Sequence, residues 1–298
     1  MSRRHLIERW AFPVVWVVLP FTMGPAFADA LGPCAPLFRT SCSVGLWVVW
    51  AATLGAGLVP RTVTLTAIRI VAPASLVAAG WATLASHHAG LADAAALGSA
   101  ALVTVVAMAA GTGATFVNGS AYGLEHRMPL RPPGPLLLGP VELTWVAAVA
   151  GAVAGPLLLA DAAWIAGGLL LVVGWPLAWW AGRSLHVLSR RWLVFTPAGL
   201  VLHDQLAVLE AVLVIRRHLR SVGPALVGTD ARDLTLGAFG LALEIRFSEP
   251  LPITPTPPRR GRTVAPVSSV DVPAVLFTPT RPGRVMAEVT SRELPTAT

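Results

Sequence analysis

The sequence contains no lysine: every one of its 22 basic residues is an arginine. Without lysine the chain has no phosphate-binding loop of the G-x-x-x-x-G-K-[ST] type and no Schiff-base residue. Charge is scarce altogether, because only 12% of the residues are charged, against roughly a quarter in soluble domains. The exclusive use of arginine is typical of a GC-rich bacterial genome.

Motifs that carry catalysis are also missing. The chain has neither H-E-x-x-H nor G-x-S-x-G, and no apolar segment carries the pair of acids of an intramembrane aspartyl protease. The neighbouring His87 and His88 point in different directions on a helix and make a poor metal pair. We therefore expect a protein that is not an enzyme and that binds no cofactor and no metal ion.

Hydrophobic residues, in contrast, are abundant: they make up 55% of the 298 residues, and the mean hydropathy is +0.68. A membrane-spanning helix needs about 20 mostly apolar residues. Six segments have this length and composition and predict a bundle of six transmembrane helices within residues 1–183: 10–31, 44–60, 62–86, 91–117, 141–159 and 163–181.

Arginines in the short loops predict the orientation, because cytoplasmic loops retain positive charge. With the N-terminus inside, only Arg39 lies in an outer loop. The inner ends then carry nine arginines: Arg3, Arg4, Arg9, Arg61, Arg127, Arg131, Arg183, Arg190 and Arg191. We expect a multi-pass protein of the bacterial inner membrane with both termini in the cytoplasm.

The first apolar segment has a second interpretation. Its basic start, its apolar run and the sequence "AFADA" also match a signal peptide cleaved after Ala28. We favour the uncleaved helix, because the run is long for the apolar region of a signal peptide.

The two cysteines, Cys34 and Cys42, both fall in the first outer loop. Disulfides form in oxidising compartments, so this placement favours a bridge between them. Two unpaired thiols are the alternative.

Arg69 is the one clearly charged residue inside a predicted span. It follows Arg61 by eight positions, which is about 12 Å at 1.5 Å per helical residue. A side chain at that depth either extends to the membrane surface or faces the bundle interior in an ion pair. Glu142 is the best-placed acid for such a pair. Pro73, one turn later, frees the carbonyl of Arg69 and favours a kink.

The loop of residues 119–140 between the fourth and fifth segments is rich in proline. Its arginines, Arg127 and Arg131, favour a position along the inner leaflet. In the fifth segment, Gly151 and Gly155 have the spacing of small residues that lets two helices approach closely. With 27 glycines in the chain, chance explains this spacing nearly as well.

Residues 184–298 read as a small β-rich soluble domain. The runs "WLVFT" and "LVLHD" are joined by "PAG", which predicts a hairpin with Gly199 in the left-handed position. Further β-prone runs begin at Ala211, Leu241 and Ala274, and a short amphipathic helix is expected from 284 to about 292. The proline-rich stretch at about 254–269 is a flexible insertion.

Several strands followed by one helix resemble the pleckstrin-homology-like domain of many bacterial membrane proteins. The resemblance covers residues 184–295 and is based on element order. It implies a partly open antiparallel barrel, closed at one end by the C-terminal helix. Lipid-binding members have a basic first hairpin loop, whereas "PAG" is uncharged, so the resemblance implies contact with a protein. The whole chain is similar to the uncharacterised multi-span membrane proteins of high-GC Gram-positive bacteria.

A basic cluster of Arg216, Arg217 and Arg220 is the densest in this domain. It is either a solvated strand edge or a contact with the membrane surface. Nucleic-acid binding is not expected, because the aromatic residues do not alternate with the basic ones. They are expected in the core instead: Trp192, Phe195, Phe239, Phe247 and Phe277.

From these features we expect a non-enzymatic membrane anchor, assembly factor or scaffold that acts through its cytoplasmic domain. Its expected partners are the lipid bilayer and another membrane or cytoplasmic protein. The alternative is a small transporter or channel subunit with a pathway near Arg69 and Glu142.

Overall fold

The computed structural model describes residues 3–86, 90–257 and 268–297. The chain forms two compact units: residues 1–120 with 141–186, called the membrane unit, and residues 121–140 with 187–298, called the β unit. The chain therefore passes between the units three times. His87, His88 and most of the predicted insertion lie outside the described residues.

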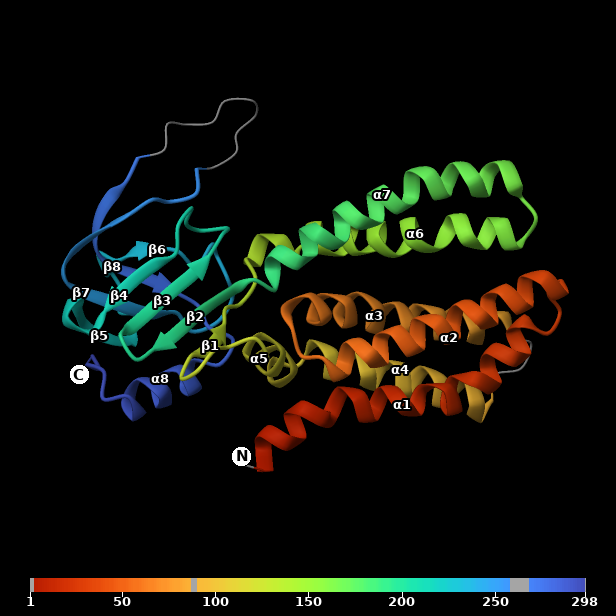
Figure 1. The fold of residues 1–298 in the computed structure, drawn as a ribbon, viewed down its shortest axis with the longest axis horizontal. Coiled ribbons are helices and arrows are strands. Elements are labelled where there is room, and N and C mark those ends of the chain that lie inside the picture. Colours follow the sequence, from red (N-terminus) through yellow and green to blue (C-terminus); the bar gives the residue numbers. More distant parts are fainter. Residues whose placement is uncertain (1–2, 87–89, 258–267, 298) are drawn as a thin grey trace. The chain divides into compact units, whose positions relative to one another are not determined.

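The membrane unit consists of helices (Figure 1). They are α1 (Arg3–Leu31), α2 (Pro36–Leu58), α3 (Thr62–Ala85), α4 (Leu91–Met108), α5 (Ala110–Asn118), α6 (Pro140–Ala160) and α7 (Trp164–Leu188). Of these seven described helices, the six other than α5 are long and apolar enough to cross a membrane. This confirms the six predicted spans. A helix suits these segments because it satisfies every backbone polar group internally, as a lipid environment requires.

The fourth predicted segment is not one continuous helix, as the sequence suggested. It breaks at Ala109, which has the extended backbone angles φ −59° and ψ 140°, and continues as α5. The carbonyls that the break frees find other donors: the Thr112 hydroxyl donates to the Val106 carbonyl (2.6 Å). Thr112 belongs to the same segment, whereas Arg69 Nε, which donates to the Ala107 carbonyl (3.4 Å), comes from α3. The apolar pattern of the segment alone does not reveal the break.

The β unit contains two four-stranded sheets. The first has the order β1 (His126–Pro129), β2 (Arg191–Thr196), β3 (Gly199–Asp204) and β4 (Val212–Ile215), with all pairs antiparallel. The predicted hairpin between β2 and β3 is confirmed, but its turn consists of Pro197 and Ala198, and Gly199 already belongs to β3, where it pairs with Thr196. Gly199 has φ +152°, and a Cβ on it would lie 2.1 Å from the Val214 carbonyl oxygen, so only glycine fits.

The second sheet has the order β5 (Leu219–Pro224), β7 (Leu243–Ile253), β8 (Val270–Phe277) and β6 (Arg232–Asp233). Strands β6 and β8 are parallel and the other pairs are antiparallel. The chain then forms the expected amphipathic helix, α8 (Pro282–Ser291). Val285 and Val289 are the buried positions of α8 and lie one helical turn apart, as expected of an amphipathic helix.

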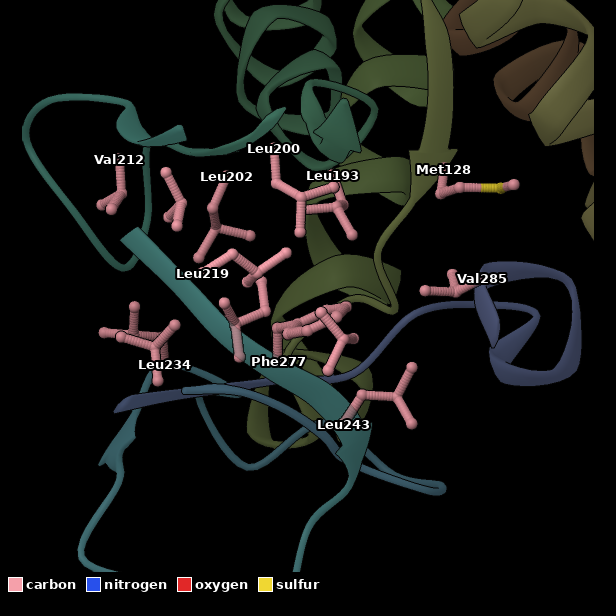
Figure 2. Packing of buried hydrophobic residues seen from close by; sticks show 14 of the residues in the cluster. Met128, Leu193, Leu200, Leu202, Val212, Leu219, Leu234, Leu243, Phe277 and Val285 are labelled. Atoms are coloured by element: carbon pink, nitrogen blue, oxygen red, sulfur yellow. The ribbon is translucent and has the colours of Figure 1, made fainter. Parts of the chain in front are cut away.

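One hydrophobic core joins the two sheets and α8 (Figure 2). Alternate residues of the hairpin contribute Leu193, Leu200 and Leu202, while Phe277 comes from β8 and Val285 from α8. Figure 2 shows Met128 of β1 near Val285. The core therefore includes a residue from the loop between two spans.

Residues 119–140, for which the sequence predicted no strand, supply one to the β unit. Residues 121–140 belong to the β unit, and β1 pairs with β2 along its whole length, from His126 opposite Phe195 to Pro129 opposite Trp192. The Leu130 amide donates to the Arg191 carbonyl and the Arg131 amide to the Thr278 carbonyl. The predicted soluble domain thus gains its edge strand from a segment about 60 residues earlier in the chain.

Candidate functional site

An apolar surface lies beside one end of the second sheet. Four side chains, all more than half exposed, form what we call the loop patch: Leu226 (77%), Val227 (106%), Phe239 (58%) and Leu241 (54%). The Ala225 amide donates to the Ala242 carbonyl (3.1 Å). This bond holds the two loops together next to Leu226 and Leu241, so the four residues come from neighbouring segments.

The loop that carries Phe239 has an unusual backbone. Leu236, Gly237 and Gly240 have φ of +54°, +68° and +117°. The Phe239 ring lies beside Gly134, where a Cβ would approach it to within 3.1 Å. The prediction that Phe239 belongs to the core is therefore wrong. The left-handed turns hold the ring at the surface against the segment that precedes α6, while Phe195, Phe247 and Phe277 are in the core as expected.

Acidic side chains accompany the loop patch. Asp230 follows Val227 in the connection from β5 to β6, and Asp233 lies in β6 itself. Arg246 bonds both Asp230 (2.7 Å) and Glu244 (2.7 Å), which fixes this connection to β7. Arg232 lies between Asp230 and Asp233, and Arg131 Nε lies 3.1 Å from where Gly240 would carry a Cβ. The loop patch is therefore bordered by charges of both signs, as the polar rim of a protein interface is.

A buried ion pair lies where the loop between the spans meets the hairpin. Arg191 donates from Nε and Nη2 to the two carboxylate oxygens of Asp204 (2.8 and 2.6 Å), and both side chains are 1% exposed. Its Nη1 donates to the Arg131 carbonyl (2.7 Å), and Asp204 also accepts the Leu206 amide. Arg191 therefore connects the start of β2, the end of β3 and the segment after β1.

The predicted basic cluster does not act as one group. Arg216 donates to the main-chain carbonyls of Arg292 and Glu293 just after α8. The negative C-terminal end of the helix dipole also favours a cation at this place. Arg217 and Arg220 are exposed. Of the three, Arg216 therefore has a structural role in holding α8.

A second polar connection joins α8 to β1. His126 Nδ1 lies 3.0 Å from Glu288 Oε2, and Arg292 Nε donates to Glu288 Oε1 (2.7 Å). Arg292 also donates to the Leu124 carbonyl (3.0 Å). Burial alone would raise the pKa of Glu288, but the hydrogen bonds from Arg292 and His126 outweigh burial and lower that pKa below its usual 4.5.

The lowered pKa of Glu288 predicts a dependence on pH. A carboxyl whose pKa is lower in the folded state stabilises that state above its unfolded pKa, and this contribution disappears as the pH falls through the folded pKa. Glu288→Gln is expected to lower the stability of α8 at pH 7 and to make little difference at an acidic pH below the folded pKa of Glu288. Hydrogen exchange of the α8 amides in the full-length protein measures both. A difference of equal size at the two pH values would contradict the predicted role.

Arg69 lies beside the break between α4 and α5. Its Nε donates to the Ala107 carbonyl (3.4 Å), and its Nη2 lies 2.9 Å from where Gly113 would carry a Cβ. In the described part of the chain it forms no ion pair with Glu142, the predicted partner, which is exposed on the first turn of α6. Arg69 instead places a cation at the C-terminal end of α4, where the helix dipole favours positive charge.

Arg69→Leu is accordingly expected to destabilise the membrane unit. It leaves the Ala107 carbonyl without its donor, at a cost of about 1–3 kcal/mol. The measurement is the thermal unfolding midpoint of the purified protein in detergent, with Arg69→Gln as a control that keeps an N–H donor and retains part of the stability. An Arg69→Leu variant as stable as the wild type would contradict this role and would indicate that the Arg69 side chain only extends toward the membrane surface.

The two predicted disulfide partners are free thiols in the structure. Cys34 lies in the turn between α1 and α2, within 4.0 Å of the Ala30 carbonyl, and Cys42 lies in α2. The bridge between them stays a prediction for the oxidised protein.

Some functional residues escape sequence reasoning. Arg191 follows a span and another arginine, so it reads as a topology signal, and nothing local indicates its burial. Leu226 and Val227 follow Pro224 and precede Gly228 in "GPALVG", which is a turn signal around apolar residues and marks them as exposed. Among the described residues no cluster of three metal-ligating side chains occurs. No family model, no curated protein and no solved structure matches the chain.

Proposed function

We propose that the chain is a non-enzymatic membrane anchor or assembly scaffold of the bacterial inner membrane, and that it holds another protein through its β unit. The single observation that carries the proposal is the loop patch of Leu226, Val227, Phe239 and Leu241, each more than half exposed. Large exposed apolar side chains gathered on neighbouring segments are typical of interaction surfaces. The arginines of the predicted inner loops support a cytoplasmic β unit and cytoplasmic termini.

The attachment of the β unit suits an anchor. The unit contains a strand from the segment between α5 and α6, and it connects covalently to the membrane unit at three places. A domain joined to the spans at three places stays at the membrane during binding and release of a partner. The two four-stranded sheets with one C-terminal helix support a pleckstrin-homology-like fold as part of this proposal.

The proposed partner is a protein and not the bilayer. The segment that carries Leu226 and Val227 has no basic residue between Pro224 and Asp230 that would attract an anionic leaflet. The hairpin turn at Pro197 and Ala198 is exposed and uncharged, unlike the basic loop of lipid-binding members.

The proposal is tested by affinity purification of the full-length chain from its own cells. Combining Val227→Glu with Phe239→Glu places two negative charges on the loop patch. Charged side chains are depleted in the core of protein interfaces because their desolvation is unfavourable. The control is Leu213→Glu, at an exposed apolar residue of β4 (57%) outside the loop patch. We expect a stoichiometric partner with the wild type and the control and at least a roughly tenfold loss with the double variant, a cost of about 1.4 kcal/mol. Equal recovery from all three would contradict the proposal.

A transporter or channel subunit is the second candidate function. The break of the fourth span at Ala109, next to Arg69, favours it, because broken helices and intramembrane charges form many transport sites. The freed carbonyls of Val106 and Ala107 have protein donors, which favours a structural role for the break. Reconstituted protein that conducts ions and loses conduction in Arg69→Gln, while remaining folded, would reverse this preference.

A further inference from the structure

A groove lies between α1, α2 and α3 of the membrane unit, whose helices Figure 1 labels. It encloses about 520 Å³, within the range of roughly 300–1,000 Å³ that small-molecule sites occupy. Large apolar side chains dominate its lining, including Met23, Phe27 and Trp47. Of the described residues that line it, only Arg39 is charged.

The inner part of the groove is held by a reciprocal pair of hydrogen bonds. Trp16 Nε1 donates to the Trp50 carbonyl (2.9 Å), and Trp50 Nε1 donates to the Trp16 carbonyl (3.1 Å). Pro20 is the cause on the side of α1, because it has no N–H to bond the Trp16 carbonyl four residues earlier. Both indole N–H groups are thus satisfied within the protein, and the rings present apolar faces to the groove.

Small residues of α1 provide the space. Gly24, Ala28 and Gly32 all line the groove, and a Cβ on Gly24 would meet nothing within 4 Å. Glycine is unfavourable inside a helix by roughly 1 kcal/mol relative to alanine. No neighbouring atom requires glycine at position 24. The consequence of glycine there is the open space in the groove.

The length of the groove matches one leaflet. Along α2 it extends from Arg39 to Trp50, eleven residues or about 16 Å at 1.5 Å per residue. Half of a hydrocarbon core of roughly 30 Å is about 15 Å. An acyl chain whose headgroup lies beside Arg39 would therefore end near the pair of tryptophans.

Arg39 supplies a charge at the open end. Its side chain is exposed, and in the described residues it has no hydrogen bond or ion pair. A guanidinium group binds phosphate in two-pronged geometry. An unpartnered arginine at the mouth of an apolar groove complements a lipid with an anionic headgroup.

We propose that this groove binds one anionic phospholipid, with its phosphate-bearing headgroup at Arg39 and an acyl chain along α1 and α2 toward Trp16 and Trp50. On the orientation proposed above, the lipid belongs to the outer leaflet. The site lies in the membrane unit and is independent of the loop patch.

The test is native mass spectrometry of the full-length protein in detergent, titrated with phosphatidylglycerol and phosphatidylcholine that carry identical acyl chains. Arg39→Gln removes the charge, Arg39→Lys keeps it, and Arg183→Gln removes an exposed arginine of α7 that does not line the groove. Gly24→Leu places a larger side chain in the groove at a position where the Cβ meets nothing within 4 Å. The wild type should prefer phosphatidylglycerol roughly tenfold, as expected for one charge-assisted contact.

Arg39→Gln should abolish this preference, Arg39→Lys should keep part of it, and Arg183→Gln should keep all of it. Gly24→Leu should reduce the binding of both lipids. Equal affinity of the wild type for the two lipids, or an unchanged preference in Arg39→Gln, would overturn the proposal. So would a dimer that Gly24→Leu prevents, because a second copy of the chain would then occupy the groove.

Discussion

Asp204→Ala is expected to unfold the hairpin end of the β unit. The substitution leaves the guanidinium of Arg191 buried, at 1% exposure, without its carboxylate. Removing one partner of a buried ion pair costs about 3–5 kcal/mol, a large part of the roughly 5–15 kcal/mol that stabilises a domain. Hydrogen exchange of the β2 and β3 amides in the full-length protein should show nearly complete loss of protection, while the amides of the membrane helices remain protected.

Two controls separate burial from charge. Asp230→Ala removes the partner of Arg246 at the surface, where Asp230 is 62% exposed, and it should leave the exchange of β2 and β3 unchanged. The double variant Arg191→Met with Asp204→Leu removes both charges and should recover much of the lost protection. Normal protection in Asp204→Ala would contradict the buried pair.

Gly151→Leu should separate the hairpin of α6 and α7. A Cβ on Gly151 would lie 2.5 Å from the Gly174 carbonyl oxygen, and a Cβ on Gly174 would lie 2.5 Å from the Gly151 carbonyl oxygen. The obstructing atoms are backbone, so the two helices must move apart. Overpacking costs about 1–3 kcal/mol even where side chains adjust, and we expect the upper end or more.

The thermal unfolding midpoint in detergent measures this effect. Gly168→Leu is the matched control, because Gly168 lies in the same hairpin and a Cβ there meets nothing within 4 Å. The midpoint should fall for Gly151→Leu and stay close to that of the wild type for Gly168→Leu. Equal midpoints for the two variants would refute close backbone contact between these helices.

Much of the fold follows from the sequence, since the six spans depend on the length and composition of single segments. The β2–β3 hairpin was predictable because its signal, "PAG" between two β-prone runs, is local. Strand β1 was not, since the pairing of His126 with Phe195 is a long-range contact and "HRMP" has no strand pattern. The break at Ala109 is accompanied by a donor from Arg69 in another helix, which the segment considered alone does not reveal.

In the candidate sites, too, local features are predictable from the sequence and long-range contacts are not. Arg69 was recognised because a charge inside an apolar run is conspicuous, but its partner is the Ala107 carbonyl and not the Glu142 carboxylate. Backbone acceptors carry no signature in a sequence. Phe239 was expected in the core because it is aromatic, whereas the positive φ angles of Leu236, Gly237 and Gly240 hold it at the surface. The exposure of Phe239 therefore depends on the conformation of its loop and not on its residue type.

The most direct test of the central claim, that the β unit holds a protein partner through the loop patch, is photo-crosslinking in living cells. A photoreactive amino acid replaces Val227 in the full-length chain, and Leu213 carries it in the control. We predict one discrete protein adduct from position 227, absent from position 213 and lost when Phe239→Glu is added. Adducts with lipid alone at position 227, or the same adducts from both positions, would contradict the claim.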